Sequence, residues 1–261
     1  MNDISKVTQR SVEGTSLLFG ISPLHSHIRF YECLLHVAYR LDFNKWQARS
    51  TEEKTRVANR KQHIQTHFRR EIGLIVDLPT QGGGTTNDGN SARKFFANPA
   101  ISARITGIKE EIIVRFSVIL EVISSGREIN CDLFRLYCTE TAEIFVENYW
   151  WYPLPASVHK VLIHGWQIMQ NSSLPVGMLS EEPQEARNKD YRYYREHHTR
   201  KDTREHTNED LLKILLVSSD PVITSFCRNS KKPLQKLSTD TLKLLASQAK
   251  KDNSESGSDD E

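Results

Sequence analysis

Apolar residues recur every three or four positions along most of this chain, and that spacing predicts helices. The first predicted helix covers His27 to Leu41. The second covers Thr51 to Ile72 and is long and mostly charged, with a thin apolar stripe. A helix this polar is expected to lie largely exposed, or to lie against something charged.

The most regular apolar pattern lies in the middle of the chain. It predicts a helix from Ile108 to Ser125 with Gly126 after its end, and a second helix from Asp132 to Tyr149. A third helix is expected to start near Pro155 and to run to about Met169. The stripe that should face the core is Ile112, Phe116, Ile119, Leu120 and Ile123.

Turn residues separate these helices and frame two more. We interpret the glycine-rich segment from Pro79 to Asn90 as a loop, and residues 174–177 as a short turn or extended segment. A helix capped by Ser180 should run to His197, and Thr207 to Asp210 resemble a capping box before a last helix. The predicted fold class is therefore mainly α.

Charge is distributed unevenly along the 261 residues. The formal net charge is +2, but residues 252–261 carry five acids and no base, so residues 1–251 carry +7. A basic body suits a protein that meets a polyanion, although charge alone favours an ordinary soluble domain with a disordered acidic end. We expect a lead-in over 1–22, a helical domain over 23–225 and a polar, largely disordered tail over 226–261.

Two functional classes lack support in the sequence. No apolar run approaches the length of a membrane span, so no membrane partner is expected. The four cysteines form no C-x-x-C pair and no secretory signal opens the chain, which indicates a reducing compartment.

Three stretches carry a resemblance to a known family. They are Ser22–Trp46, Asn87–Phe96 and the longest, Pro155–Lys201, which includes Pro155-Ala156-Ser157-Val158-His159 and Leu179-Ser180-Glu181-Glu182-Pro183. In order and spacing these stretches resemble the C-terminal part of Transib-type DNA transposases, which are related to the catalytic subunit of the V(D)J recombinase.

The resemblance implies an RNase H-like nuclease whose core is interrupted by a helical insertion. In the intact family enzyme two aspartates and a later glutamate hold two Mg²⁺ or Mn²⁺ ions for strand nicking and transfer. We expect this chain to hold the helical insertion and the C-terminal region, and to begin downstream of both aspartates, so that the fold core is incomplete.

Glu185 matches the family's third metal-binding carboxylate. Taken alone, a glutamate four residues before Lys189 is usually an exposed i,i+4 ion pair. The resemblance instead implies a catalytic, metal-ligating ancestry. Pro183 departs from the usual family alanine and can change the direction in which Glu185 points.

His159 and His164 match the family's zinc histidines. Five residues apart on a helix, they should point about 140° from each other unless the helix ends near Gly165. The C-x-x-C that completes the family's Zn²⁺ site is absent, and a structural zinc needs four ligands. The alternative interpretation, which we weigh equally, is that these are two helix histidines that bind no metal.

Basic residues in two stretches are candidates for contact with double-stranded DNA. A glycine-rich loop that opens into a basic helix suits phosphate contact, and basic residues interleaved with tyrosines suit backbone binding and stacking. The alternatives are a solvated turn and an exposed amphipathic helix whose tyrosines pack inward. The candidates are Asn90, Arg93, Lys94, Arg187, Arg192, Arg195, Arg200 and Lys201.

Three functions remain open at this point. The first is a truncated or domesticated transposase-like protein in the nucleus that binds DNA without nuclease activity of its own. The second is one part of an active enzyme that completes its two-metal site with further sequence, as a homodimer or with a full-length transposase. The third is a helical protein-interaction module with no role in nucleic-acid binding.

Overall fold

The computed structural model describes residues 20–81, 84–227 and 237–246. Within these ranges the chain is helical, and its only β-contacts are two isolated bridges, Pro79 with Thr85 and Ile129 with Leu245. The prediction of a mainly α protein is confirmed. No helix in this part of the chain is both long enough and apolar enough to cross a membrane.

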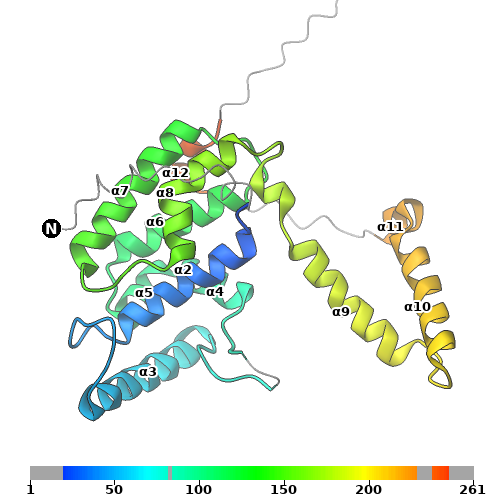
Figure 1. Ribbon diagram of the computed structural model, residues 1–261, viewed down its shortest axis with the longest axis horizontal. Helices are drawn as coiled ribbons and strands as arrows, with labels where there is room; N and C mark the ends of the chain where they lie inside the picture. Colours follow the sequence, from blue (N-terminus) through cyan, green and yellow to red (C-terminus); the bar gives the residue numbers. More distant parts are fainter. Residues whose placement is uncertain (1–19, 82–83, 228–236, 247–261) are drawn as a thin grey trace, which may run out of the picture.

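Helix α2 (Pro23–Ala38) runs through the centre of a helical bundle (Figure 1). It starts four residues before the predicted His27, because the Ser22 hydroxyl accepts a hydrogen bond from the His25 amide (3.2 Å) and Pro23 fits the first turn. It also ends at Ala38, before the predicted Leu41. Its fully buried face forms the middle of the core and comprises Phe30, Tyr31, Leu34 and Leu35.

Five further helices form the rest of the bundle. They are α4 (Gly89–Phe96), α5 (Pro99–Thr106), α6 (Glu110–Ser124), α7 (Cys131–Tyr149) and α8 (Ala156–Gln170). Three of them (α4, α6 and α8) pack directly on α2, and the other two pack on these three. The stripe predicted on α6 is buried throughout. The edge of Phe30 faces Phe116 with ring centroids 4.7 Å apart, and Phe116 stacks on Phe145. On α7, by contrast, Leu133 and Leu136 lie exposed and not in the core.

Helix α3 (Thr51–Ile72) lies along one side of the bundle and has the predicted bounds. Ser50 and Glu53 form a capping box at its start, and Gly73 ends it with a φ of 60°. Ile64 and Phe68 are its buried residues, so this polar helix meets the core through a narrow stripe.

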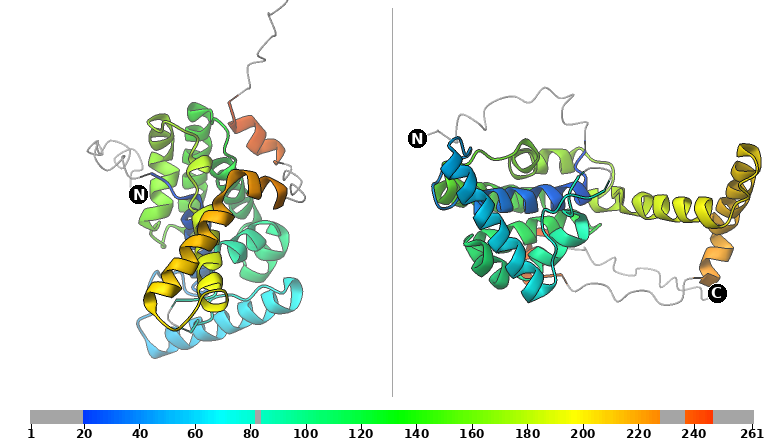
Figure 2. Two further views of the ribbon diagram at one scale, coloured as in Figure 1. Left: turned by 90° about the vertical axis from the view of Figure 1, so that its right-hand side faces the viewer. Right: turned by 90° about the horizontal axis from the view of Figure 1, so that it is seen from below.

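Beyond a short 3₁₀ turn, η2 (Val176–Leu179), the chain leaves the bundle. Helix α9 (Glu182–His197) extends away from it, α10 (Arg204–Ser219) turns back from the far end of α9, and α11 (Pro221–Cys227) packs against α10 (Figures 1 and 2). We call these three helices the arm. No residue of α9 is buried, and Leu211 is the buried residue of α10.

The predicted capping box at Thr207 is wrong. Helix α10 starts four residues earlier, where the Thr203 hydroxyl accepts a hydrogen bond from the His206 amide (3.1 Å). The Thr207 hydroxyl donates to the Thr203 carbonyl (2.9 Å), one turn back within the helix. A threonine whose hydroxyl donates to the carbonyl four residues earlier lies inside a helix, so Thr207 does not cap the start of α10.

The folded part of the chain extends into both the expected lead-in and the expected polar tail. Residues 237–246, placed within a polar tail, contain α12 (Thr239–Leu244), and Leu244 and Leu245 are buried in the core. Ile21, placed in the lead-in, is buried as well. The remaining parts of these two expectations, residues 1–19, 228–236 and 247–261, lie outside the described residues.

Candidate nucleic-acid interface

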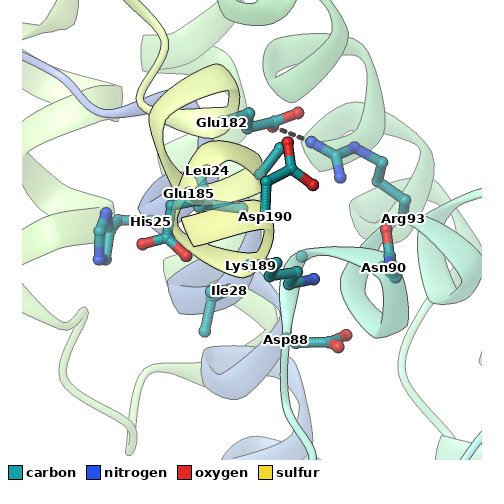
Figure 3. A pocket seen from close by; sticks show the side chains of 12 residues that line it. Leu24, His25, Ile28, Asp88, Asn90, Arg93, Glu182, Glu185, Lys189 and Asp190 are labelled. Atoms are coloured by element: carbon teal, nitrogen blue, oxygen red, sulfur yellow. Dashed lines mark hydrogen bonds and ion pairs between the residues drawn. The ribbon is translucent and has the colours of Figure 1, made fainter. Parts of the chain in front are cut away.

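A cleft of about 450 Å³ lies where the arm joins the bundle (Figure 3). Its walls come from the start of α2, the start of α4 and the first two turns of α9. Three of the predicted site residues, Asn90, Arg93 and Glu185, line it together, although about ninety positions separate α4 from α9 in the sequence. The structure therefore brings the second and third stretches of the resemblance to one place.

The loop before α4 is shaped to start a helix at this cleft. The Asp88 carboxylate accepts a hydrogen bond from the Ser91 amide (2.7 Å) and caps the helix, so the helix starts at Gly89, one residue before the expected end of the loop. Gly89 packs so closely on Leu24 that a Cβ there would lie 2.4 Å from the Leu24 Cδ1. This close contact seats α4 on α2 and sets the position of Asn90 and Arg93.

Two acidic residues tie the root of α9 to the bundle. Arg93 forms an ion pair with Glu182, in which each side chain is 39% exposed. The Glu181 carboxylate accepts from the Ser22 hydroxyl (2.9 Å) and lies 3.0 Å from the His25 Nδ1. We call the contact between Arg93 and Glu182 the latch, because it joins α4 to the arm.

The buried His27 lies close to Arg93. Burial lowers the pKa of its imidazole, and its Nδ1 lies 2.9 Å from the Pro23 carbonyl oxygen. His27 itself does not line the cleft. The charged side chains that line it are Arg93 and Lys189 and the carboxylates of Asp88, Glu182, Glu185 and Asp190.

Glu185 is exposed in the first turn of α9 and lines the cleft. Among the described residues no three His, Cys, Asp or Glu side chains are arranged to hold a metal ion. The donors around Glu185 therefore do not fit the two-metal centre that the resemblance implies, since such a centre needs clustered carboxylates.

Two of the predicted DNA-contacting residues, Arg187 and Arg200, form hydrogen bonds with other residues of the arm. Arg187 donates to the hydroxyls of Ser218 (2.6 Å) and Ser219 (2.9 Å) on α10. Arg200 forms two hydrogen bonds with the Asp210 carboxylate (2.9 and 2.8 Å), which hold the pKa of that carboxyl well below its usual range. These contacts fasten α10 to α9, so a phosphate must compete with them for the two guanidinium groups.

Lys201 and Lys94 also lie against the chain's own backbone. Lys201 donates to the Arg195 carbonyl, and the Lys94 Nζ lies 3.4 Å from the Gly73 carbonyl oxygen; Lys94 does not line the cleft. Both side chains are exposed, so an anion can still approach them.

Arg192 and Arg195 remain exposed on α9, and neither guanidinium contacts another residue in the described part of the chain. Lys189, one turn before Arg192, is also exposed and lines the cleft. The sequence analysis missed Lys189 because it was considered only as an ion-pair partner for Glu185. The i,i+3 spacing of Lys189, Arg192 and Arg195 in the sequence could have indicated that all three cations lie near one another on the helix.

Tyrosines and histidines gather at the far end of α9. The ring centroid of Tyr193 lies 5.0 Å from that of His197 and 5.1 Å from that of His198. Tyr191 and Tyr193 are 39% and 54% exposed and Tyr194 is partly buried, so none of the three tyrosines is buried as the amphipathic alternative expects.

His159 and His164 lie on α8, which continues past Gly165 to Gln170. Despite the expected angle between them, their ring centroids are 5.3 Å apart. Burial, and then the neighbouring His164, lowers the pKa of His159. No cysteine or carboxylate in the described residues joins this pair as a third ligand, so the donors do not fit a structural zinc.

No protein-family model matches this sequence, and no curated protein matches it significantly.

Proposed function

We propose that this chain is a transposase-like protein that binds the backbone of double-stranded DNA and does not cleave DNA on its own. The observation that carries the proposal is the convergence of the α4 start and α9 on one cleft, next to three exposed cations of α9. These two segments are also the ones that the resemblance to Transib transposases marks as functional.

The chemistry of the surface fits phosphate contact. Lys189, Arg192 and Arg195 occupy successive turns of a helix that buries none of its residues. Arginine and lysine side chains in such a row can each neutralise one phosphate, and they do so without regard to base sequence. Tyr191 and Tyr193 lie on the same helix, and their exposed rings provide flat surfaces on which bases can stack.

The absence of cleavage is proposed from the donor set around Glu185. Other carboxylates line the same cleft, but no three donors among the described residues are arranged to hold a metal ion, and an isolated exposed carboxylate is a poor Mg²⁺ site. An RNase H-like origin, with these helices as its insertion and C-terminal region, is part of the same proposal. A protein of this kind would act in the nucleus.

A titration of the whole chain against labelled duplexes of unrelated sequence tests this function. We expect similar affinity for all duplexes and a steep fall in affinity between about 50 and 200 mM salt, because each neutralised phosphate contributes about 0.9 to the log–log slope. Supercoiled plasmid with Mg²⁺ or Mn²⁺ should stay intact for the wild type and for Glu185→Gln alike. Failure to bind at micromolar protein in low salt contradicts the proposal, as does nicking that Glu185→Gln abolishes.

A helical interaction module is a second candidate, and one observation favours it. Five apolar side chains of α10 and α11 are 41% to 64% exposed, namely Leu212, Leu216, Val217, Val222 and Ile223. Exposed apolar residues that are contiguous often mark a protein interface. Association that persists in high salt without DNA would favour this function, since apolar contacts are not screened by ions.

A further inference from the structure

A pair of histidines lies on the outward face of α3, far from the arm. His63 and His67 are one helical turn apart, and their ring centroids are 4.1 Å from each other. They line a shallow depression with Asn59, Gln62 and Thr66. The next positions along the helix, Ile64 and Phe68, are fully buried and hold α3 on the bundle, whereas His63 is exposed and the His67 side chain is 27% exposed.

The spacing of this pair is the one that metal-binding helices use. Residues at i and i+4 point in nearly the same direction, so two imidazoles can reach one ion from a single helix. His159 and His164, at i and i+5, lack this spacing. Imidazole nitrogens are good ligands for Zn²⁺, Ni²⁺ and Cu²⁺.

Glu71, a further turn along α3, supplies a partner for the other nitrogen of one ring. Its Oε1 lies 3.4 Å from the His67 Nδ1. Arg104 on α5 forms an ion pair with the same carboxylate, which holds Glu71 in place beside His67. A carboxylate that accepts the Nδ1 proton of a histidine fixes its tautomer and leaves Nε2 free for a metal ion.

Arg70 opposes this arrangement. Its guanidinium Nη2 lies 2.8 Å from the same Nδ1 of His67, and its side chain is 65% exposed. A guanidinium can only donate, so while it is bound the proton of His67 sits on Nε2. A metal ion therefore binds only when Arg70 moves into solvent, which its exposure permits.

We propose that His63 and His67 form a two-histidine site for a transition-metal ion such as Zn²⁺, with Glu71 orienting His67 and Arg70 limiting the affinity. No third ligand joins the pair among the described residues, so water fills the remaining positions and the site is open. The inference is independent of DNA binding and of the zinc site that the resemblance implies at His159 and His164.

Calorimetric titration of the whole chain with ZnCl₂ tests the site. We expect the wild type to bind one zinc ion per chain. The zinc affinity should fall at least about tenfold in His63→Gln, because removing a metal ligand should weaken binding no less than removing a residue that only orients a ligand. His159→Gln is the matched control, because it removes one histidine of the other helical pair, and it should leave the affinity unchanged. Circular dichroism should show both variants folded, since His63 is exposed.

Two further variants separate this site from nonspecific zinc binding. Glu71→Gln should weaken binding, whereas Arg70→Ala should strengthen it several-fold by freeing Nδ1 and removing a nearby positive charge. Wild-type affinity in His63→Gln overturns the proposal. So does a loss of binding in His159→Gln, or weaker binding in Arg70→Ala.

Discussion

The basic side chains of α9 differ in what they contact, and that difference decides which of them a phosphate can reach. Arg187 is hydrogen-bonded to the serines of α10, whereas Arg192 and Arg195 point into solvent without a partner in the described chain. In the sequence the three arginines look alike. A substitution at Arg187 should therefore loosen the arm, and only the other two should report on DNA directly.

Phe116 shows how a single residue supports the bundle from which the arm extends. Its ring is fully buried between Phe30 and Phe145. Phe116→Ala should lower the free energy of unfolding by about 3–5 kcal/mol, because it removes buried apolar surface and leaves a cavity among rings that cannot close around it. Urea denaturation measures this loss.

Leu136→Ala on α7 is the control for that substitution. Its side chain is 58% exposed, so the change should stay within about 0.5 kcal/mol. If the two variants lost equal free energies of unfolding, the assignment of Phe116 to the core and of Leu136 to the surface would be contradicted.

At the scale of elements, the latch links the bundle to the arm through one ion pair. Arg93 is both the partner of Glu182 and a predicted phosphate contact, so DNA and Glu182 compete for the same guanidinium. Glu182→Gln should free Arg93, raise the affinity for duplex DNA and steepen the salt dependence by about 0.9 in the log–log slope.

Glu185→Gln provides the comparison for the latch. It removes the same charge from the same cleft, and Glu185 forms no ion pair with a cation in the described residues. Its effect should be limited to reduced repulsion, with little change in slope. Identical salt slopes in the two variants, or a flatter slope in Glu182→Gln, would show that Arg93 takes no part in binding.

The sequence predicts some of these elements well and others poorly, for local reasons. Helix α3 has the predicted bounds because Ser50 with Glu53 and then Gly73 mark its two ends. Helix α12 was missed because six residues in a polar stretch give too short a pattern, although Leu244 is buried in the core. The cleft could not be derived from periodicity, because it depends on the pairing of Arg93 with Glu182, 89 positions apart.

At the scale of the whole molecule, the arm and the bundle present different surfaces. Helix α9 has 16 residues and is about 24 Å long, and it projects from the bundle while α3 lies along another side (Figures 1 and 2). Lys54, Arg56 and Arg69 on α3 are also exposed bases. The chain therefore contains a charge-matched control for the three cations of the arm.

The central claim, that DNA binds along α9, is tested most directly by comparing two triple variants in the same salt titration. Lys189→Ala/Arg192→Ala/Arg195→Ala removes the arm cations, and Lys54→Ala/Arg56→Ala/Arg69→Ala removes the same charge from α3. The account predicts that the arm variant binds all duplexes more weakly, with a slope flatter by up to about 2.7, and that the α3 variant keeps the wild-type slope. An unchanged slope in the arm variant, or an equal flattening in both, would contradict it.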